Sequence, residues 1–166
     1  MVNSEINTGI SNVVSFWKGG DLKRAEFELG QLLIKNNNNA LVLTAAADFY
    51  YQNCNMRQAV PYARKALSVI KKDDPLDHVL YLSRLMCCIG EDEQANALAR
   101  DYLNANTCSQ TQLAQLADHF LNLDLIEEAV AVFNTIDENQ LDDFGMAMFG
   151  TATLYSGDIL GAKAIF

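Results

Sequence analysis

The sequence has few residues that break helices and no long apolar run. Its 166 residues include only two prolines, Pro61 and Pro75. Because proline inside a helix removes a hydrogen bond and clashes with the preceding turn, this scarcity permits long helices. No apolar run approaches the roughly 18 residues of a membrane-spanning helix, and no basic region followed by an apolar core marks a secretory signal at the N-terminus. We therefore expect a cytoplasmic protein without membrane insertion.

The cysteines and histidines lack the spacing of a metal site. None of the four cysteines forms a C-x-x-C pair, and His78 and His119 lie far apart in the sequence. A zinc site needs about four such ligands at characteristic spacings, so we expect no metal. Cys87 and Cys88 are adjacent, but reduced thiols in a reducing cytosol are the expected state rather than a strained disulfide.

Motifs of catalysis are also missing. The sequence contains no G-x-S-x-G, no H-E-x-x-H and no phosphate-binding glycine loop, because Gly19 and Gly20 are not part of a G-x-x-x-x-G-K pattern. Acidic pairs such as Asp73 and Asp74 fall at expected helix starts or loops, where solvated charge is usual. Two histidines without a partner nucleophile do not support acid–base chemistry. We expect neither an enzyme nor a cofactor.

Basic residues are scarce in the second part of the chain. Residues 1–90 contain ten Lys/Arg and eight Asp/Glu, a balance of +2, whereas residues 91–166 contain two Lys/Arg and thirteen Asp/Glu, a balance of −11. A surface of this sign repels the phosphates of nucleic acids and anionic membranes. It attracts basic protein segments. The alternative is that the acidic residues only keep the protein soluble.

What the sequence does contain is an internal repeat. Five segments share a turn residue, often a polar residue after it, and an alanine five positions after the turn residue. They read GDLKRA (20–25), CNMRQA (54–59), GEDEQA (90–95), DLIEEA (124–129) and GDILGA (157–162). The alanines are 34, 36, 34 and 33 residues apart. A fixed period of this length indicates stacked supersecondary units.

Each repeat has the pattern of a helical hairpin. Apolar residues with helical spacing precede the turn, as in ISNVVSFW before Gly20, and follow it, as in AVAVFNTI after Asp124. Glycine ends the first helix by adopting the left-handed conformation, and the next Asp or Asn caps the second helix. The small alanine lets the two helices pack closely. The predicted repeats span residues 6–39, 40–75, 76–109, 110–142 and 143–166, the last incomplete.

The period near 34 and the G-D-x-x-x-A start of the second helix resemble the tetratricopeptide repeat (TPR). The resemblance covers nearly the whole chain, from Ile6 to Phe166. In the first helices, the small signature position is filled by Val13, Ala47, Ser83, Ala117 and Gly150. The large position three residues later is filled by Phe16, Tyr50, Met86, Phe120 and Thr153. In the second helices, the bulky position is filled by Leu29, Ala63, Ala99, Phe133 and Phe166.

These repeats are divergent, and other helical-hairpin arrays such as Sel1-like repeats fit the spacing less well. The resemblance implies an all-α fold. It implies a single domain over residues 1–166, built as a right-handed superhelical array of about five TPR-like hairpins with an extended concave surface.

In the TPR family the first helix of each repeat lines a groove that holds partner proteins. Carrying those positions over gives candidate groove residues in all five repeats. They are Ile10, Val14, Trp17, Thr44, Asp48, Tyr51, Leu80, Arg84, Cys87, Ala114, Asp118, Leu121, Ala147, Thr151 and Leu154. Trp17, Tyr51 and Arg84 are residue types enriched at binding hot spots. Asp48 and Asp118 suit basic groups on a partner. The alternatives are a core role for Trp17 and plain solvation for the two aspartates.

One family activity does not fit. Co-chaperones of the TPR family grip acidic chaperone tails through lysines and asparagines on their first helices. The corresponding residues here include no basic clamp: they are Ile10, Val14, Thr44, Asp48, Asp77 and Tyr81. Two of them carry the wrong charge, so we expect no binding of an acidic tail.

The expected function is therefore that of a protein-interaction module, an adaptor or chaperone-like protein. It would bind a peptide or helix of another protein that has a basic or amphipathic segment. Two alternatives remain, both motivated by the apolar final residues AKAIF, which lack a polar capping helix. One is a non-catalytic N-terminal TPR domain of a larger enzyme such as a glycosyltransferase. The other is an oligomerising scaffold that forms a homodimer through its C-terminal end.

Overall fold

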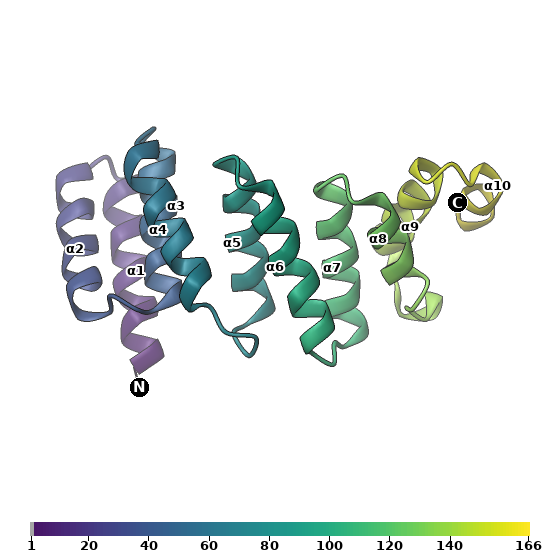
Figure 1. The fold of residues 1–166 in the computed structure, drawn as a ribbon, viewed down its shortest axis with the longest axis horizontal. Coiled ribbons are helices and arrows are strands. Elements are labelled where there is room, and N and C mark those ends of the chain that lie inside the picture. Colours follow the sequence, from purple (N-terminus) through teal and green to yellow (C-terminus); the bar gives the residue numbers. More distant parts are fainter. Residues whose placement is uncertain (1) are drawn as a thin grey trace. The chain divides into compact units, whose positions relative to one another are not determined.

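A computed structural model describes the backbone of residues 2–166 and the side chains of residues 4–166. That part of the chain folds into ten α-helices and contains no strand (Figure 1). The helices are α1 (Val2–Lys18), α2 (Leu22–Lys35), α3 (Ala40–Gln52), α4 (Met56–Val69), α5 (Leu76–Cys88), α6 (Asp92–Ala105), α7 (Gln110–Asn122), α8 (Ile126–Phe133), α9 (Asp143–Tyr155) and α10 (Ile159–Ile165), with a 3-10 turn, η1, at Glu138–Gln140. The predicted all-α array of TPR-like hairpins is confirmed.

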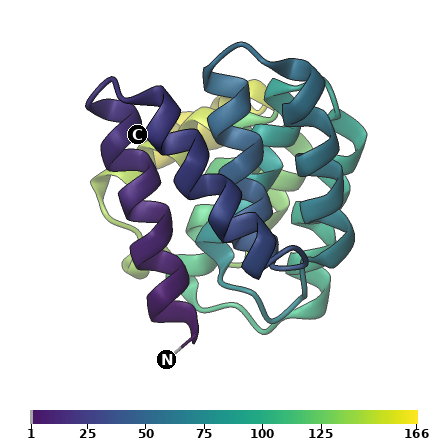
Figure 2. The ribbon, with the colours of Figure 1, turned by 90° about the vertical axis from the view of Figure 1, so that its left-hand side faces the viewer.

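The chain divides into two compact units. Unit 1 comprises residues 1–71 and 84–92, and unit 2 comprises residues 72–83 and 93–166. In unit 1, α1 packs on α2 and α3 packs on α4 as antiparallel pairs, seen from the side in Figure 2. In unit 2, the pairs are α7 with α8 and α9 with α10, and α9 also contacts α7 and α8.

The turn inside each hairpin has one conformation. The five predicted turn residues are those with positive φ among the described residues: Gly20 (85°), Cys54 (56°), Gly90 (82°), Asp124 (60°) and Gly157 (91°). At Gly90 the amide donates to Cys87 O at 2.9 Å, and the next amide, of Glu91, donates to Met86 O at 2.9 Å. The other four turns repeat this pair of bonds. Carbonyls at the end of each first helix are thereby satisfied.

The repeat alanines lie where the two helices of each hairpin meet. Ala25, Ala59, Ala95 and Ala129 are 0% exposed, and Ala162 is 2% exposed. A larger side chain there would force the helices apart, which a close-packed interior does not accommodate without strain. This confirms the role that the sequence predicted for these residues.

Aromatic side chains fill much of the core of unit 1. Trp17 packs edge-to-face on Phe49, with ring centroids 6.1 Å apart, and Tyr50 stacks on Tyr62 at 5.7 Å. The Tyr50 hydroxyl donates to Glu26 Oε1 at 3.4 Å. Burial, together with the charge of Glu26, raises the pKa of Tyr50 to about 12, so its hydroxyl remains a donor.

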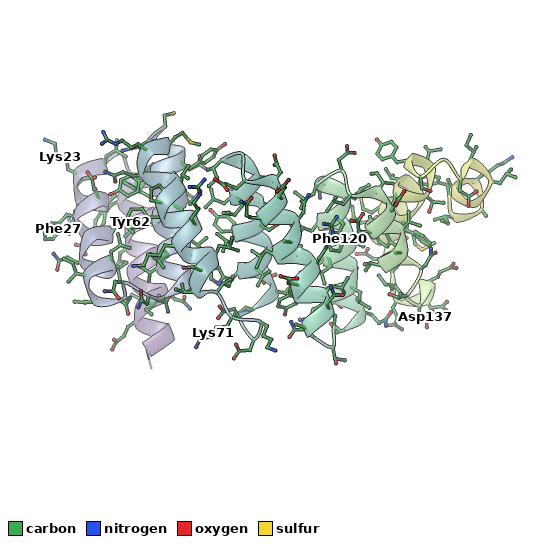
Figure 3. All side chains as sticks on the ribbon, viewed as in Figure 1. Lys23, Phe27, Tyr62, Lys71, Phe120 and Asp137 are labelled. Carbon is green, nitrogen blue, oxygen red and sulfur yellow. The ribbon has the colours of Figure 1, made fainter. Side chains whose placement is uncertain are left out.

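Unit 2 contains a buried polar contact between α5, α6 and α7. The Ser83 hydroxyl donates to Ala95 O at 2.9 Å, and Nε2 of His119 lies 2.8 Å from the same hydroxyl oxygen. The Ser83 hydroxyl has one proton, which it donates to Ala95 O. The second hydrogen bond is therefore donated by Nε2–H of His119 to the Ser83 oxygen. Large buried apolar side chains of unit 2 include Phe120 of α7, labelled in Figure 3, and Phe133, whose ring stacks on Phe149 at 5.2 Å.

Ion pairs connect the second helix of one hairpin with the next hairpin. Arg100 of α6 pairs with Glu128 of α8, and its Nε donates to Glu128 Oε1 at 3.1 Å. Arg64 of α4 pairs in the same manner with Glu91, at an Nε–Oε1 distance of 3.0 Å. Both arginines lie five residues after a repeat alanine, but their partners differ in register, because Glu91 lies four residues before Ala95 and Glu128 lies one residue before Ala129. The hydrogen bond from Arg100 lowers the pKa of Glu128.

We predict opposite effects of two glycine-to-alanine substitutions. Gly90→Ala puts a Cβ into the left-handed region and lowers the free energy of unfolding by about 1 kcal/mol. Gly30→Ala lies inside α2 with nothing within 4 Å of the added methyl group, and it raises that free energy by about 0.5–1 kcal/mol through higher helix propensity. Urea denaturation followed by circular dichroism measures both. If both substitutions changed the free energy of unfolding in the same direction, the left-handed turn at Gly90 would be contradicted.

We also predict that the Arg100–Glu128 pair stabilises the fold only above acidic pH. Because the folded-state pKa of Glu128 is lowered, the contribution is present above its unfolded value of about 4.5 and is lost as pH falls through the folded value. Both side chains are partly exposed, so Arg100→Met costs only about 0.3–0.8 kcal/mol at pH 7. The difference in Tm from wild type should shrink between pH 6 and pH 3. Arg57→Met, at an exposed position, is the control, and a pH-independent difference for Arg100→Met would refute the prediction.

Candidate functional site

The structure places most of the predicted groove residues of unit 1 at least partly at the surface. Ile10, Val14 and Trp17 of α1 are half-buried, as are Asp48 and Tyr51 of α3. Trp17 also belongs to the edge of the core, because it packs against Phe49. Arg84 of α5 is exposed, and Cys87 is half-buried.

Two predicted groove residues lie in the core instead. Thr44 is 1% exposed, and its hydroxyl donates to Ala40 O at 2.8 Å within α3. Leu80 of α5 is 5% exposed. Side chains that are this deeply buried stabilise the hairpins and do not face a partner, so the position carried over from the family does not mark a groove surface at these two sites.

Near the end of α3 in unit 1, polar side chains interact with one another and with the thiol of Cys88. Gln52 Nε2 donates to Asp48 Oδ1 at 3.3 Å. A hydrogen bond with the Cys88 thiol raises the pKa of Tyr51. Burial, followed by a hydrogen bond with Asp92, raises the pKa of Cys87 to about 11. The Cys87 thiol therefore stays protonated at neutral pH, which makes it a poor nucleophile.

Unit 2 contains a distinct cavity between the first helices of its last two hairpins. The cavity has a volume of about 310 Å³ and lies between α7 and α9. Its lining consists of Thr111, Ala114, Gln115, Asp118, Phe133, Gln140, Leu141, Asp142, Phe144, Gly145 and Met148. Ala114 and Asp118 are groove residues predicted from the sequence. Leu121, Ala147, Thr151 and Leu154 are not in the lining.

The hairpin beside the cavity has a short second helix, α8. The second helices α2, α4 and α6 each have 14 residues, but α8 has 8 and ends at Phe133. The chain then passes through the 3-10 turn η1, near Asp137 in Figure 3, and returns to α9 through Gln140 and Leu141, which line the cavity. Small side chains at Ala114 and Gly145 keep the space between the helices open.

The chemistry of the cavity is apolar with two carboxylates. Phe133, Leu141, Phe144 and Met148 supply apolar walls. Asp142 is the N-cap of α9, and its Oδ1 accepts a hydrogen bond from Gly145 N at 2.8 Å, which fixes the carboxylate at the start of the helix. Asp118 reaches the cavity from α7. None of the eleven lining residues is Lys, Arg or His.

Sequence reasoning missed the contribution of α9 to this site, namely Asp142, Phe144, Gly145 and Met148. The groove positions carried over from the family lie at the same place on each successive first helix. A space between two neighbouring helices is instead bounded by facing sides, so the residues on α7 and α9 are not equivalent by repeat. The available signal was the spacing of Phe144 and Met148, which are four residues apart and so share a helix face.

Three further observations concern the described residues only. Among the side chains of residues 4–166, no group of three or more His, Cys, Asp or Glu could hold a metal ion. No helix within residues 2–166 combines the length and hydrophobicity of a membrane span. All four cysteines are free thiols.

The fold is similar to solved structures of TPR-like repeat proteins. Nearly identical TPR-like repeats, described as those of a kinesin light chain of Podosopora anserina, match with a TM-score of 0.69 and 14% identity over 98% of this chain and 92% of that chain. YrrB, described as a TPR protein with an unusual peptide-binding site, matches with a TM-score of 0.62 and 16% identity over 95% and 80%. MamA matches with a TM-score of 0.62 and 15% identity over 97% and 87%.

No protein-family model and no curated protein matches the chain. At 14–16% identity the structural similarity establishes the fold. The chain therefore has a TPR-like helical repeat fold, and the TPR resemblance predicted from the sequence is confirmed at the level of the fold.

Proposed function

We propose that the protein is an interaction module, an adaptor or chaperone-like protein, that binds a peptide or helix of a partner along its first helices. The observation that carries the proposal is the cavity between α7 and α9. It lies on first helices and includes two residues, Ala114 and Asp118, that the repeat register marked in advance. Concave, mostly apolar cavities of this size with a few polar groups are typical ligand sites.

The partner segment is amphipathic and carries basic residues. Apolar walls favour burial of apolar side chains, and the balance of −11 in residues 91–166 attracts cationic segments. YrrB is described as having a peptide-binding site, and its similar fold supports peptide binding as a use of this architecture. The five hairpins would act as one binding domain over residues 1–166, with Trp17, Asp48, Tyr51 and Arg84 as further contacts in unit 1.

We predict that filling the cavity abolishes partner binding. Peptides selected from a random 12-residue library displayed on phage should bind wild type, and Ala114→Leu should weaken their affinity at least tenfold by occupying the space they use. Fluorescence anisotropy of labelled peptides measures the Kd. Ala131→Leu makes the same change at an exposed position of α8 and should leave the Kd unchanged. A selected set that binds Ala114→Leu as tightly as wild type would rule out this groove.

A specific observation favours self-association as a second candidate function. Apolar and aromatic side chains around α10 are unusually exposed: Tyr155 (65%), Ile159 (68%), Leu160 (81%) and Phe166 (72%). Contiguous exposed apolar residues commonly mark an interface. Packing of this surface against a second copy would make the protein an oligomerising scaffold.

Light scattering after size exclusion tests this candidate. We expect wild type to form dimers at concentrations of about 100 µM and Leu160→Asp to be monomeric, because a charge at the centre of the surface would have to be buried. Ile34→Asp introduces the same charge at a similarly exposed position of α2 and should not change the mass. A monomeric wild type at these concentrations would remove this candidate.

A further inference from the structure

We propose that the cavity between α7 and α9 recognises one long basic side chain of the partner segment, with lysine as the simplest form. This inference rests on the proposed groove function and names the group that the groove selects. It is carried by three features of the same cavity: its volume, its apolar walls and its two carboxylates, which no cationic side chain of the lining neutralises.

The volume fits one such side chain with space for an apolar neighbour. A lysine side chain has five heavy atoms beyond Cα, which at roughly 20–30 Å³ each occupy about 100–150 Å³. The cavity has about 310 Å³. An inserted lysine therefore leaves room for part of an adjacent side chain of the same segment at the mouth.

The walls suit the aliphatic stem of the side chain. Leu141, Phe144 and Met148 are apolar, and long basic side chains bury their methylene groups against such surfaces while the charged end finds a polar partner. Phe144 is 67% exposed although it lines the cavity. Its ring is therefore available to cover an entering stem and to interact with a cation through its face.

The carboxylates decide the sign of the ligand. Asp118 comes from α7 and Asp142 from the start of α9, so they belong to the two elements that bound the cavity, and the lining contains no cationic side chain. A neutral ligand would leave these acids without a charged partner, and an anion would be repelled. A cation pairs with them and also gains hydrogen bonds to charged acceptors, which are stronger than neutral ones.

The N-terminus of α9 also borders the cavity, and by itself it would favour an anion. A helix end corresponds to roughly half a positive charge. Here Asp142 caps that end through Gly145 N, and Asp143 occupies the first turn. Two full negative charges therefore outweigh the helix dipole, and the cavity remains a site for cations.

Small probes that copy the two ends of the side chain test the inference directly. n-Butylammonium reproduces the lysine stem and charge, n-butanol lacks the charge, and butyrate reverses it. Binding is followed by the 13C-methyl NMR signals of methionine, since Met148 lines the cavity and Met146 does not. We expect butylammonium to shift the Met148 signal with a Kd on the order of 1–10 mM, as suits a ligand of five heavy atoms. Butanol should bind at least fivefold more weakly, and butyrate should not bind.

Two double variants that remove the same charge distinguish binding to the cavity carboxylates from general attraction to the acidic surface of unit 2. Asp118→Asn/Asp142→Asn removes both carboxylates of the cavity, and asparagine at 142 still caps α9. It should weaken butylammonium binding at least tenfold. Asp124→Asn/Glu127→Gln removes the same charge at exposed positions outside the lining and should change the Kd less than twofold. Equal effects of the two variants, or equal binding of butanol and butylammonium, would overturn the inference.

The outcome is distinguishable from failure of the groove function itself. If Ala114→Leu abolishes binding of the selected peptides but those peptides are not enriched in Lys or Arg and tolerate Asp118→Asn/Asp142→Asn, the groove function stands and the basic-side-chain inference fails. If butylammonium binds as predicted but Ala114→Leu leaves peptide binding intact, the site exists and the peptides bind elsewhere. Enrichment of Lys or Arg in peptides lost by both variants supports both proposals.

Discussion

The close approach of two helices within each hairpin is the constraint on which the rest of the structure depends. It requires a chain reversal within a few residues, which the left-handed turn residue provides, and a side chain no larger than a methyl group at the point of contact. Gly90 and Ala95 supply these in one hairpin, and Cys54 and Ala59 do so in another. A non-glycine residue in the left-handed region costs about 1–2 kcal/mol. That Cys54 and Asp124 accept this cost indicates that the two terminal hydrogen bonds and the packing behind them outweigh it.

The candidate site arises where the repeat departs from its own pattern. The second helices α2, α4 and α6 each have 14 residues, a length that would carry α8 past Phe133. Instead α8 ends there, and a loop with a single 3-10 turn leads to α9. Loops carry function on a rigid scaffold because their side chains are not committed to the core. Here the loop contributes Leu141 and Asp142, while α7 and α9 hold the opposite walls in place.

The parts of the fold that depend on local chemistry could be predicted from the sequence. The turn residues and the repeat alanines act within one hairpin, so their spacing alone located all five turns. The parts that depend on tertiary packing could not. Thr44 and Leu80 occupy positions that face a groove in the related repeats, yet here they lie in the core, because the rotation of a helix depends on what packs against it. Phe144 and Met148 were missed for a similar reason: they line a space between helices, and no position within one repeat defines that space.

In the proposed recognition, the net charge of residues 91–166 attracts the partner, and the cavity selects among partners. Residues 91–166 hold thirteen acidic and two basic residues, and Arg100, one of those two, is already paired with Glu128. Of the thirteen acidic side chains, Glu91 and Glu128 form ion pairs with arginines, and the others contribute to a field that accelerates the approach of any cationic segment. Such a field does not discriminate among basic segments, because surface pairs are weak and screened by salt. Discrimination requires a place where the cation is partly removed from water beside fixed carboxylates and apolar walls. Asp142, held by Gly145 N, and Asp118 provide the carboxylates, and Phe144 and Met148 provide the walls, so specificity follows from the cavity rather than from net charge.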